Sequence, residues 1–157
     1  MTTTMTRIAL FGSLYVVLTV LPPFHAISYG PIQVRVSEAL TVFPFLFPEI
    51  TWGLAIGCFF ANLAGGLGLW DITLGPIITL SAGLVTTRVT RSWMAPIPPV
   101  LFNSFGVSIY LSYIFEVPYW YTVIFIMIGQ GIACFGIGYP LLRLVQKKML
   151  RYGNNRK

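Results

Sequence analysis

Arg35 and Glu38 stand three residues apart in a chain that is otherwise largely apolar. A charged side chain is costly at membrane depth, and one that is retained there usually has a partner and a function. At this spacing the two residues share a helix face, so they could simply neutralise one another. Gln33 and Ser37 add donors and acceptors to the same segment, which is more than a lone salt bridge requires. The segment therefore favours a site that recognises a small polar ligand.

Four further polar residues lie within or at the ends of later apolar stretches: Asn62, Asp71, Asn103 and Gln130. An unpaired amide in lipid would be costly, so we expect Asn62 to meet either another helix or a ligand. Asp71 opens an apolar stretch, where it either caps a helix N-terminus or contacts the ligand.

Aromatic residues cluster near the ends of the same stretches: Phe24, Tyr29, Trp70, Tyr119, Trp120 and Tyr121. Such residues commonly form a belt at the membrane interface. A few of them, Tyr29 or Trp70 in particular, could instead stack on a flat ligand.

Several chemistries lack the residues they need. Cys58 and Cys134 are single cysteines in apolar stretches, and His25 is the only histidine, so no metal or redox cofactor is expected. The Gly65–Gly68 cluster is not followed by a lysine and does not form a phosphate-binding loop. We therefore expect no ATPase activity in this chain.

The composition sets the class of protein that must position these residues. Of 157 residues, 56% are hydrophobic and only 9% are charged, which is typical of an integral membrane protein. The apolar stretches approach the roughly 20 residues that cross a bilayer. The prediction is an all-α membrane protein with residues 1–157 in a single domain, a bundle of six transmembrane helices. The predicted spans are residues 8–27, 34–47, 50–69, 72–87, 97–115 and 118–144, followed by a basic tail at 145–157.

The basic residues predict the orientation of this bundle. Lysine and arginine favour the cytoplasmic side when they lie in short loops. With both termini in the cytoplasm, every basic residue except Arg35 follows this rule. Arg35 then lies toward the outer side. The sequence Ala26-Ile27-Ser28 could pass for a signal-peptidase site, but we expect the first span to be retained because its loss would leave five spans and one basic cluster outside.

Small residues predict where helices pack closely. Gly53, Gly57, Ala61 and Gly65 recur every four residues, as do Gly75, Thr79, Gly83 and Thr87. A second small patch consists of Ala9, Gly12 and Ser13. It faces either a helix of this chain or another subunit.

Three segments together resemble a known family: Ile32–Leu40 with Phe43-Pro44, Gly53–Cys58 with Ala61-Asn62, and Trp70–Ile72 with Gly75. The chain is similar to the QueT-type queuosine-precursor transporters, which are substrate-binding (S) subunits of energy-coupling factor (ECF) transporters. The resemblance implies a six-helix S subunit in the bacterial cell membrane that binds a deazaguanine near the outer face. Its implied partners are a transmembrane coupling subunit and two cytoplasmic ATPases, which use the ATP; no nucleic acid is involved.

The resemblance also suggests residue roles. Ala9 and Ser13, with Gly12 beside them, would dock on the coupling subunit, as an Ala-x-x-x-Ala pattern does in related S subunits. Where relatives carry Gly-Glu, this chain has Gly129-Gln130, which could change ligand preference.

The chemistry of a deazaguanine suggests a role for each polar residue. Glu38 would accept the adjacent N–H donors of the base, and Arg35 would orient Glu38 or donate to the carbonyl. Asn62 and Asn103 would read the remaining edge, and Asp71 would pair with an aminomethyl group. Three alternatives stay open at this point: an S subunit for another vitamin-like molecule, an intramembrane enzyme, and a structural or assembly protein of the membrane.

Overall fold

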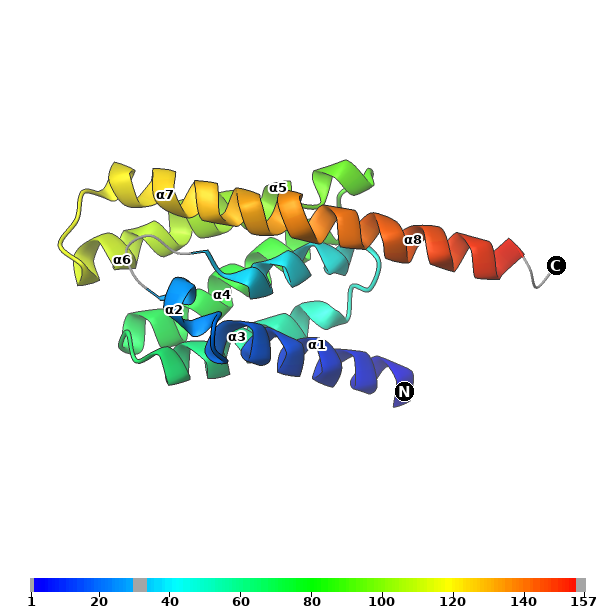
Figure 1. Ribbon diagram of the computed structural model, residues 1–157, viewed down its shortest axis with the longest axis horizontal. Coiled ribbons are helices and arrows are strands. Elements are labelled where there is room, and N and C mark those ends of the chain that lie inside the picture. Colours follow the sequence, from blue (N-terminus) through cyan, green and yellow to red (C-terminus); the bar gives the residue numbers. More distant parts are fainter. Residues whose placement is uncertain (1, 30–33, 155–157) are drawn as a thin grey trace.

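The computed structural model describes residues 2–29 and 34–154, and these residues form helices and connecting turns without a strand. Figure 1 shows long helices that run roughly side by side, with α8 extending beyond the others. In chain order the elements are α1 (Thr2–Val20), α2 (His25–Ser28), η1 (Val36–Phe45), α3 (Ile50–Gly65), α4 (Leu69–Thr86), η2 (Ser92–Met94), α5 (Ile97–Phe102), η3 (Asn103–Val107), α6 (Ser108–Ile114), α7 (Tyr119–Gly131), η4 (Ile132–Gly138) and α8 (Tyr139–Asn154).

Four helical stretches of the described chain are long and apolar enough to cross a membrane. They cover residues 2–20, 69–86, 92–114 and 119–151, while η1 and α3 are apolar but shorter. Several such helices indicate a multi-pass membrane protein. The count of six spans stays a prediction.

Helix ends differ from the predicted spans most at the two termini. The first helix was expected at 8–27, but α1 begins at Thr2 and ends at Val20. Pro22 and Pro23 follow at once, and a proline ring cannot continue the hydrogen-bonded ladder of a helix. At the other end, α8 runs to Asn154, so much of the expected basic tail is helical.

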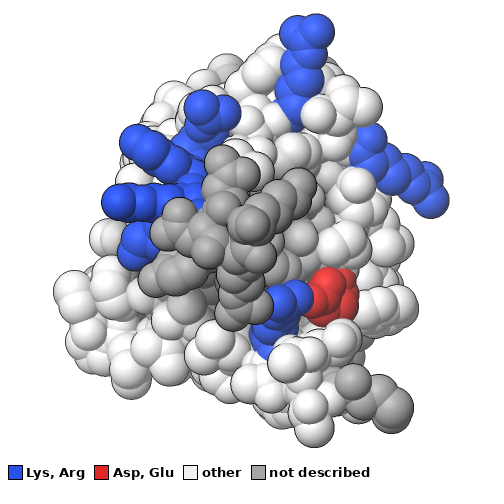
Figure 2. Space-filling model, turned by 90° about the vertical axis from the view of Figure 1, so that its right-hand side faces the viewer, with Lys and Arg blue, Asp and Glu red and all other residues white. Residues whose placement is uncertain are grey.

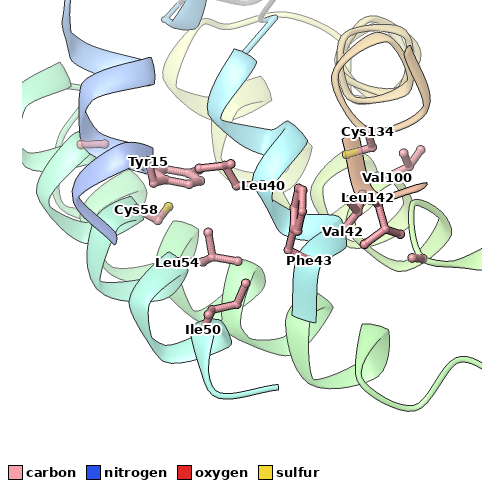
Figure 3. Packing of buried hydrophobic residues seen from close by; sticks show 12 residues of the cluster. Tyr15, Leu40, Val42, Phe43, Ile50, Leu54, Cys58, Val100, Cys134 and Leu142 are labelled. Atoms are coloured by element: carbon pink, nitrogen blue, oxygen red, sulfur yellow. The ribbon is translucent and has the colours of Figure 1, made fainter. Parts of the chain in front are cut away.

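The centre of the bundle is η1, a 3₁₀-helix of ten residues. It contacts α1, α3 and α4 on one side and α5, η4 and α8 on the other. Every residue from Ser37 to Pro44 is buried. Figure 3 shows Leu40, Val42 and Phe43 of η1 between Tyr15 and Leu54 on one flank and Cys134 and Leu142 on the other. The segment that carries Glu38 is therefore the most enclosed part of the fold.

Glycines let α1 cross α3 at backbone distance. A Cβ atom added to Gly53 would lie 2.3 Å from the carbonyl oxygen of Ile8, and one added to Gly12 would lie 2.8 Å from that of Gly53. The same applies at Gly57, whose added Cβ would lie 2.6 Å from the Gly12 oxygen. The small-residue face predicted on α3 is confirmed as a packing surface. Gly12 belongs to this internal contact, whereas Ala9 and Ser13 remain exposed.

The two ends of the molecule differ in charge. Figure 2 shows basic side chains around the end where α1 begins, with an acidic side chain beside one of them. At this end Arg7 of α1 forms a salt bridge of 2.9 Å with Glu49, which precedes α3. The hydrogen bond from Arg7 holds the pKa of Glu49 below its ordinary value. The orientation of the bundle in the membrane stays a prediction.

Candidate ligand-binding site

A small buried cavity of about 10 Å³ lies beside the start of η1. This is room for about one water molecule. Its walls come from η1 and its N-cap, α3, α4, η3, α6 and α7. The lining residues are Arg35, Glu38, Cys58, Gly75, Thr79, Asn103, Val107, Tyr110, Ile126 and Gln130.

Glu38 lies in the first turn of η1, and its side chain is 2% exposed. Each carboxylate oxygen has a different donor. The Tyr15 hydroxyl of α1 donates to Oε1, and Asn103 Nδ2 of η3 donates to Oε2 at 2.9 Å. A buried carboxylate must be hydrogen-bonded to be tolerated. Donors from two helices thus fix the orientation of Glu38 at the cavity wall.

Arg35 precedes η1, and its guanidinium has its own set of partners. Nε donates to the carbonyl oxygen of Ser28 at 3.0 Å, and Nη1 donates to Asn62 Oδ1 at 2.9 Å. Nη2 lies 3.9 Å from Asp71 Oδ1, and the guanidinium carbon lies 5.2 Å from the centre of the Tyr29 ring. Contacts with these four residues fix the position of the Arg35 guanidinium.

The interpretation of Arg35 and Glu38 as a mutually neutralising pair is wrong. Within the described residues, the only salt bridge of Arg35 is with Asp71. Arg35 is the N-cap of η1 and has an extended backbone with φ −88° and ψ 106°. Because the backbone of Arg35 is not helical, its side chain does not follow the helix face that the i, i+3 spacing had implied. Arg35 and Glu38 form no salt bridge with each other, and both line the cavity as a cation and a carboxylate.

Asn62 and Asp71 lie behind Arg35 and do not line the cavity. Asn62 donates to the carbonyl oxygen of Asp71 at 2.7 Å, which confirms that its amide meets another helix. Asp71 Oδ1 accepts a hydrogen bond of 2.8 Å from the Tyr110 hydroxyl. The prediction of Asp71 as a helix cap is wrong, because α4 begins after Gly68 without a side-chain cap.

Two polar atoms of this cluster lack a hydrogen-bond partner among the described residues: Arg35 Nη2 and Asp71 Oδ2. Both residues are more than nine-tenths buried. Leaving a charged group unsatisfied in the interior costs several kcal/mol in order of magnitude. This unused hydrogen-bonding capacity beside a cavity is what a ligand-binding site requires.

Asn103 and Gln130 are placed by irregular helix geometry. Asn103 is the first residue of the π-helical η3, and Gln130 lies just before the π-helical η4. π-helical turns are rare and are frequent at functional sites, since the extra residue re-aims side chains. The predicted residues Arg35, Glu38, Asn103 and Gln130 therefore meet around one cavity.

The remaining predicted site residues lie elsewhere. Ser37 is fully buried, and its hydroxyl accepts from Thr19 at 2.6 Å on the α1 side. Trp70 is 57% exposed on the surface and does not line the cavity. Tyr29 is partly buried against Arg35, and its hydroxyl donates to the carbonyl oxygen of Ala61 at 2.5 Å. Gln33 lies outside the described residues.

Tyr15 and Tyr110 were not predicted, although both hydroxyls reach site carboxylates. A signal was present, because both lie inside apolar stretches and not at the span ends where tyrosine usually forms the interfacial belt. A buried phenol needs a hydrogen-bond partner, and the few carboxylates of the chain were the obvious acceptors.

The fold and this cavity define a multi-pass helical membrane protein with an enclosed polar site. Comparison with known proteins then gives the family: a model of the QueT transporter family matches residues 5–147. The chain belongs to that family. The Queuosine precursor transporter QueT of Lactococcus lactis subsp. cremoris (strain MG1363) is 41% identical over 73 residues, which are 46% of this chain and 43% of that relative. The match thus spans less than half of the relative's length. No solved structure matches the chain.

Proposed function

We propose that the chain is the substrate-binding S subunit of an ECF-type importer and captures a queuosine precursor. The ligand would be a deazaguanine such as the aminomethyl-deazaguanine base or queuine. The carrying observation is that Arg35, Glu38, Asn103 and Gln130 line one buried cavity. Family membership and the similarity to a queuosine precursor transporter support the same substrate. In this proposal the chain crosses a bacterial cell membrane six times, with both termini in the cytoplasm, and has no catalytic role.

The cavity residues suit both the N–H donors and the carbonyl acceptor of a deazaguanine. Glu38 would accept the two adjacent N–H groups of the base, since each carboxylate oxygen has lone pairs beyond those used by Tyr15 and Asn103. Arg35 Nη2, which has no hydrogen-bond partner among the described residues, would donate to the carbonyl. Asp71 would orient Arg35 from behind, a role that its position favours over direct contact with an aminomethyl group. Gln130 and Asn103 would supply the remaining amide contacts.

The cavity must widen to accept such a ligand. Room for about one water is far below the volume of a bicyclic base. The π-helical turns η3 and η4 are regions where the helix ladder is already interrupted. Small shifts of the helices that carry Asn103 and Gln130 would therefore open the site at a low cost in free energy.

The energy for uptake would come from partner subunits. We propose that a transmembrane coupling subunit docks on α1, where Ala9 and Ser13 are exposed along a surface groove of about 480 Å³ between α1 and α3. Met5, Ile56 and Phe60 give this groove apolar walls. A small, apolar helix face allows another helix to approach closely in a membrane.

Replacing Ala9 by tryptophan should block this docking. We expect the coupling subunit recovered with the chain to fall about tenfold or more, equivalent to about 1.4 kcal/mol of binding free energy. The assay is co-purification after co-expression with an ECF coupling subunit and its two ATPases. Ile109→Trp is the control, because Ile109 is 63% exposed on α6, away from the groove. Equal recovery of both variants would exclude the α1 face as the docking surface.

Ligand-dependent thermal stabilisation of the purified chain tests the substrate. A ligand that binds only the folded state raises its stability, by about 2.7 kcal/mol at a hundredfold excess over Kd. We expect the aminomethyl-deazaguanine base or queuine to stabilise the chain, and guanine and common vitamins to do so much less. Stabilisation by a vitamin alone would replace the substrate, and no stabilisation by any compound would contradict the proposed function.

A further inference from the structure

Tyr15 and Tyr110 form a matched pair around the site. Tyr15 on α1 is fully buried and Tyr110 on α6 is 4% exposed. The hydroxyl of each makes one hydrogen bond among the described residues, and in both cases the acceptor is a carboxylate on another element. Tyr15 holds Glu38, and Tyr110 holds Asp71. Both carboxylates that face or support the cavity are thus restrained by a phenol from a different helix.

The position of Tyr15 is set by the close crossing of α1 and α3. A Cβ added to Gly57 would lie 3.0 Å from Tyr15 Cβ, so the base of the tyrosine side chain packs directly on α3. Its ring reaches from there to Oε1 of Glu38. Because Asn103 occupies Oε2, the carboxylate plane has little freedom to rotate.

Tyr110 holds the second carboxylate. It lines the cavity and donates to Oδ1 of Asp71, the oxygen nearest to Arg35 Nη2. The absence of a side chain at Gly75 makes room for Asn62 beside this contact, since an added Cβ would lie 2.3 Å from Asn62 Nδ2. Tyr110 therefore ties α6 to the residues that hold Arg35.

We propose that Tyr15 and Tyr110 are positioning residues that set ligand discrimination, each through one charged group. This inference rests on the proposed function. Tyr15 acts through Glu38 and governs recognition of the donor edge of the base. Tyr110 acts through Asp71 and Arg35 and governs recognition of the carbonyl. The two effects are separable, because the two sets of side-chain contacts share no residue.

The test measures ligand affinity in Tyr15→Phe and Tyr110→Phe, which remove the hydroxyl and keep the ring. Three ligands are compared: the deazaguanine that stabilises the unmodified chain, an analogue without the exocyclic amine, and an analogue with an amine in place of the carbonyl. Hydrogen bonds to charged groups correspond to about 10- to 100-fold in affinity. We expect Tyr15→Phe to reduce discrimination against the first analogue about tenfold, and Tyr110→Phe to do so for the second.

Two other tyrosines provide controls for the same chemical change. Tyr113 is 78% exposed on α6. The Tyr119 hydroxyl donates to the Phe105 carbonyl oxygen at 3.1 Å, outside the cavity, and Tyr119→Phe removes that hydrogen bond. Both Phe variants should retain the ligand ratios. If Tyr15→Phe and Tyr110→Phe lower affinity for all three ligands by the same factor, or leave the ratios unchanged, the inference is wrong. If the unmodified chain binds none of the deazaguanines, the proposed function itself fails.

Discussion

Glu38→Gln should lower the affinity for a deazaguanine about 100-fold. The glutamine offers one acceptor oxygen in place of two, so it cannot accept both N–H groups of the base. Its amide would also turn a donor toward Tyr15 or Asn103, which now donate to the carboxylate. Hydrogen bonds to a buried charged group contribute about 1.5–3 kcal/mol each. Isothermal titration or ligand-dependent thermal stabilisation measures the loss.

Glu116→Gln is the matched control for this substitution. Glu116 is exposed in the turn after α6, does not line the cavity, and undergoes the same chemical change. Its ligand affinity should equal that of the unmodified chain. A Glu38→Gln protein that binds as tightly as the Glu116→Gln protein would remove Glu38 from the ligand contacts.

Gly53→Ala should destabilise the fold more than any comparable substitution of a helical glycine. The added methyl group would lie 2.3 Å from the Ile8 carbonyl oxygen, which belongs to the backbone and cannot rotate away. Helices α1 and α3 would have to separate, and overpacking of this kind costs about 1–3 kcal/mol or more. We expect the free energy of unfolding in detergent, followed by tyrosine and tryptophan fluorescence, to fall by at least about 2 kcal/mol.

Gly131→Ala shows the effect of the same methyl group where there is room. Gly131 ends α7, and an added Cβ there would have no neighbour within 4 Å. Alanine is the better helix former by about 1 kcal/mol, so this variant should be as stable as the unmodified chain or slightly more so. Equal stability of the two variants would mean that the α1–α3 crossing is less tight than described.

The sequence predicted the class of protein and four polar residues that line one cavity. Composition alone indicated a helical membrane protein, because so apolar a chain cannot be buried in a small soluble domain. Arg35, Glu38, Asn103 and Gln130 were selected as polar residues in apolar stretches, and they converge on one cavity. The cost of burying a polar group is a local property, so it can be read from the sequence.

The pairing of those residues could not be predicted in the same way. Spacing suggested that Arg35 would meet Glu38, whereas Arg35 pairs with Asn62 and Asp71 on two other helices. The partners of Glu38 come from α1 and η3. Such contacts depend on which helices are neighbours and how each is rotated. The apolar stretches carry little information about rotation, because a helix surrounded by lipid and other helices has no strongly polar face.

Trp70 was predicted to stack on the ligand, but it does not line the cavity. An aromatic residue next to Asp71 was a natural candidate for stacking on a flat ligand, but consecutive residues of a helix point about 100° apart. Asp71 faces the interior and is fully buried, so Trp70 is directed outward and is 57% exposed. Because Trp70 and Asp71 are adjacent in a helix, their side chains point in different directions and do not contact the same site.

The 3₁₀ geometry of η1 also determines how far this short segment reaches. A 3₁₀-helix rises about 2.0 Å per residue, compared with about 1.5 Å for an α-helix. The ten residues of η1 therefore extend over about 20 Å instead of about 15 Å. A segment of only ten residues thus reaches along about two thirds of the roughly 30 Å that a hydrocarbon core measures. Substitutions that convert η1 to an α-helix would shorten it by about 5 Å and would change where Glu38 lies relative to its partners on the neighbouring helices.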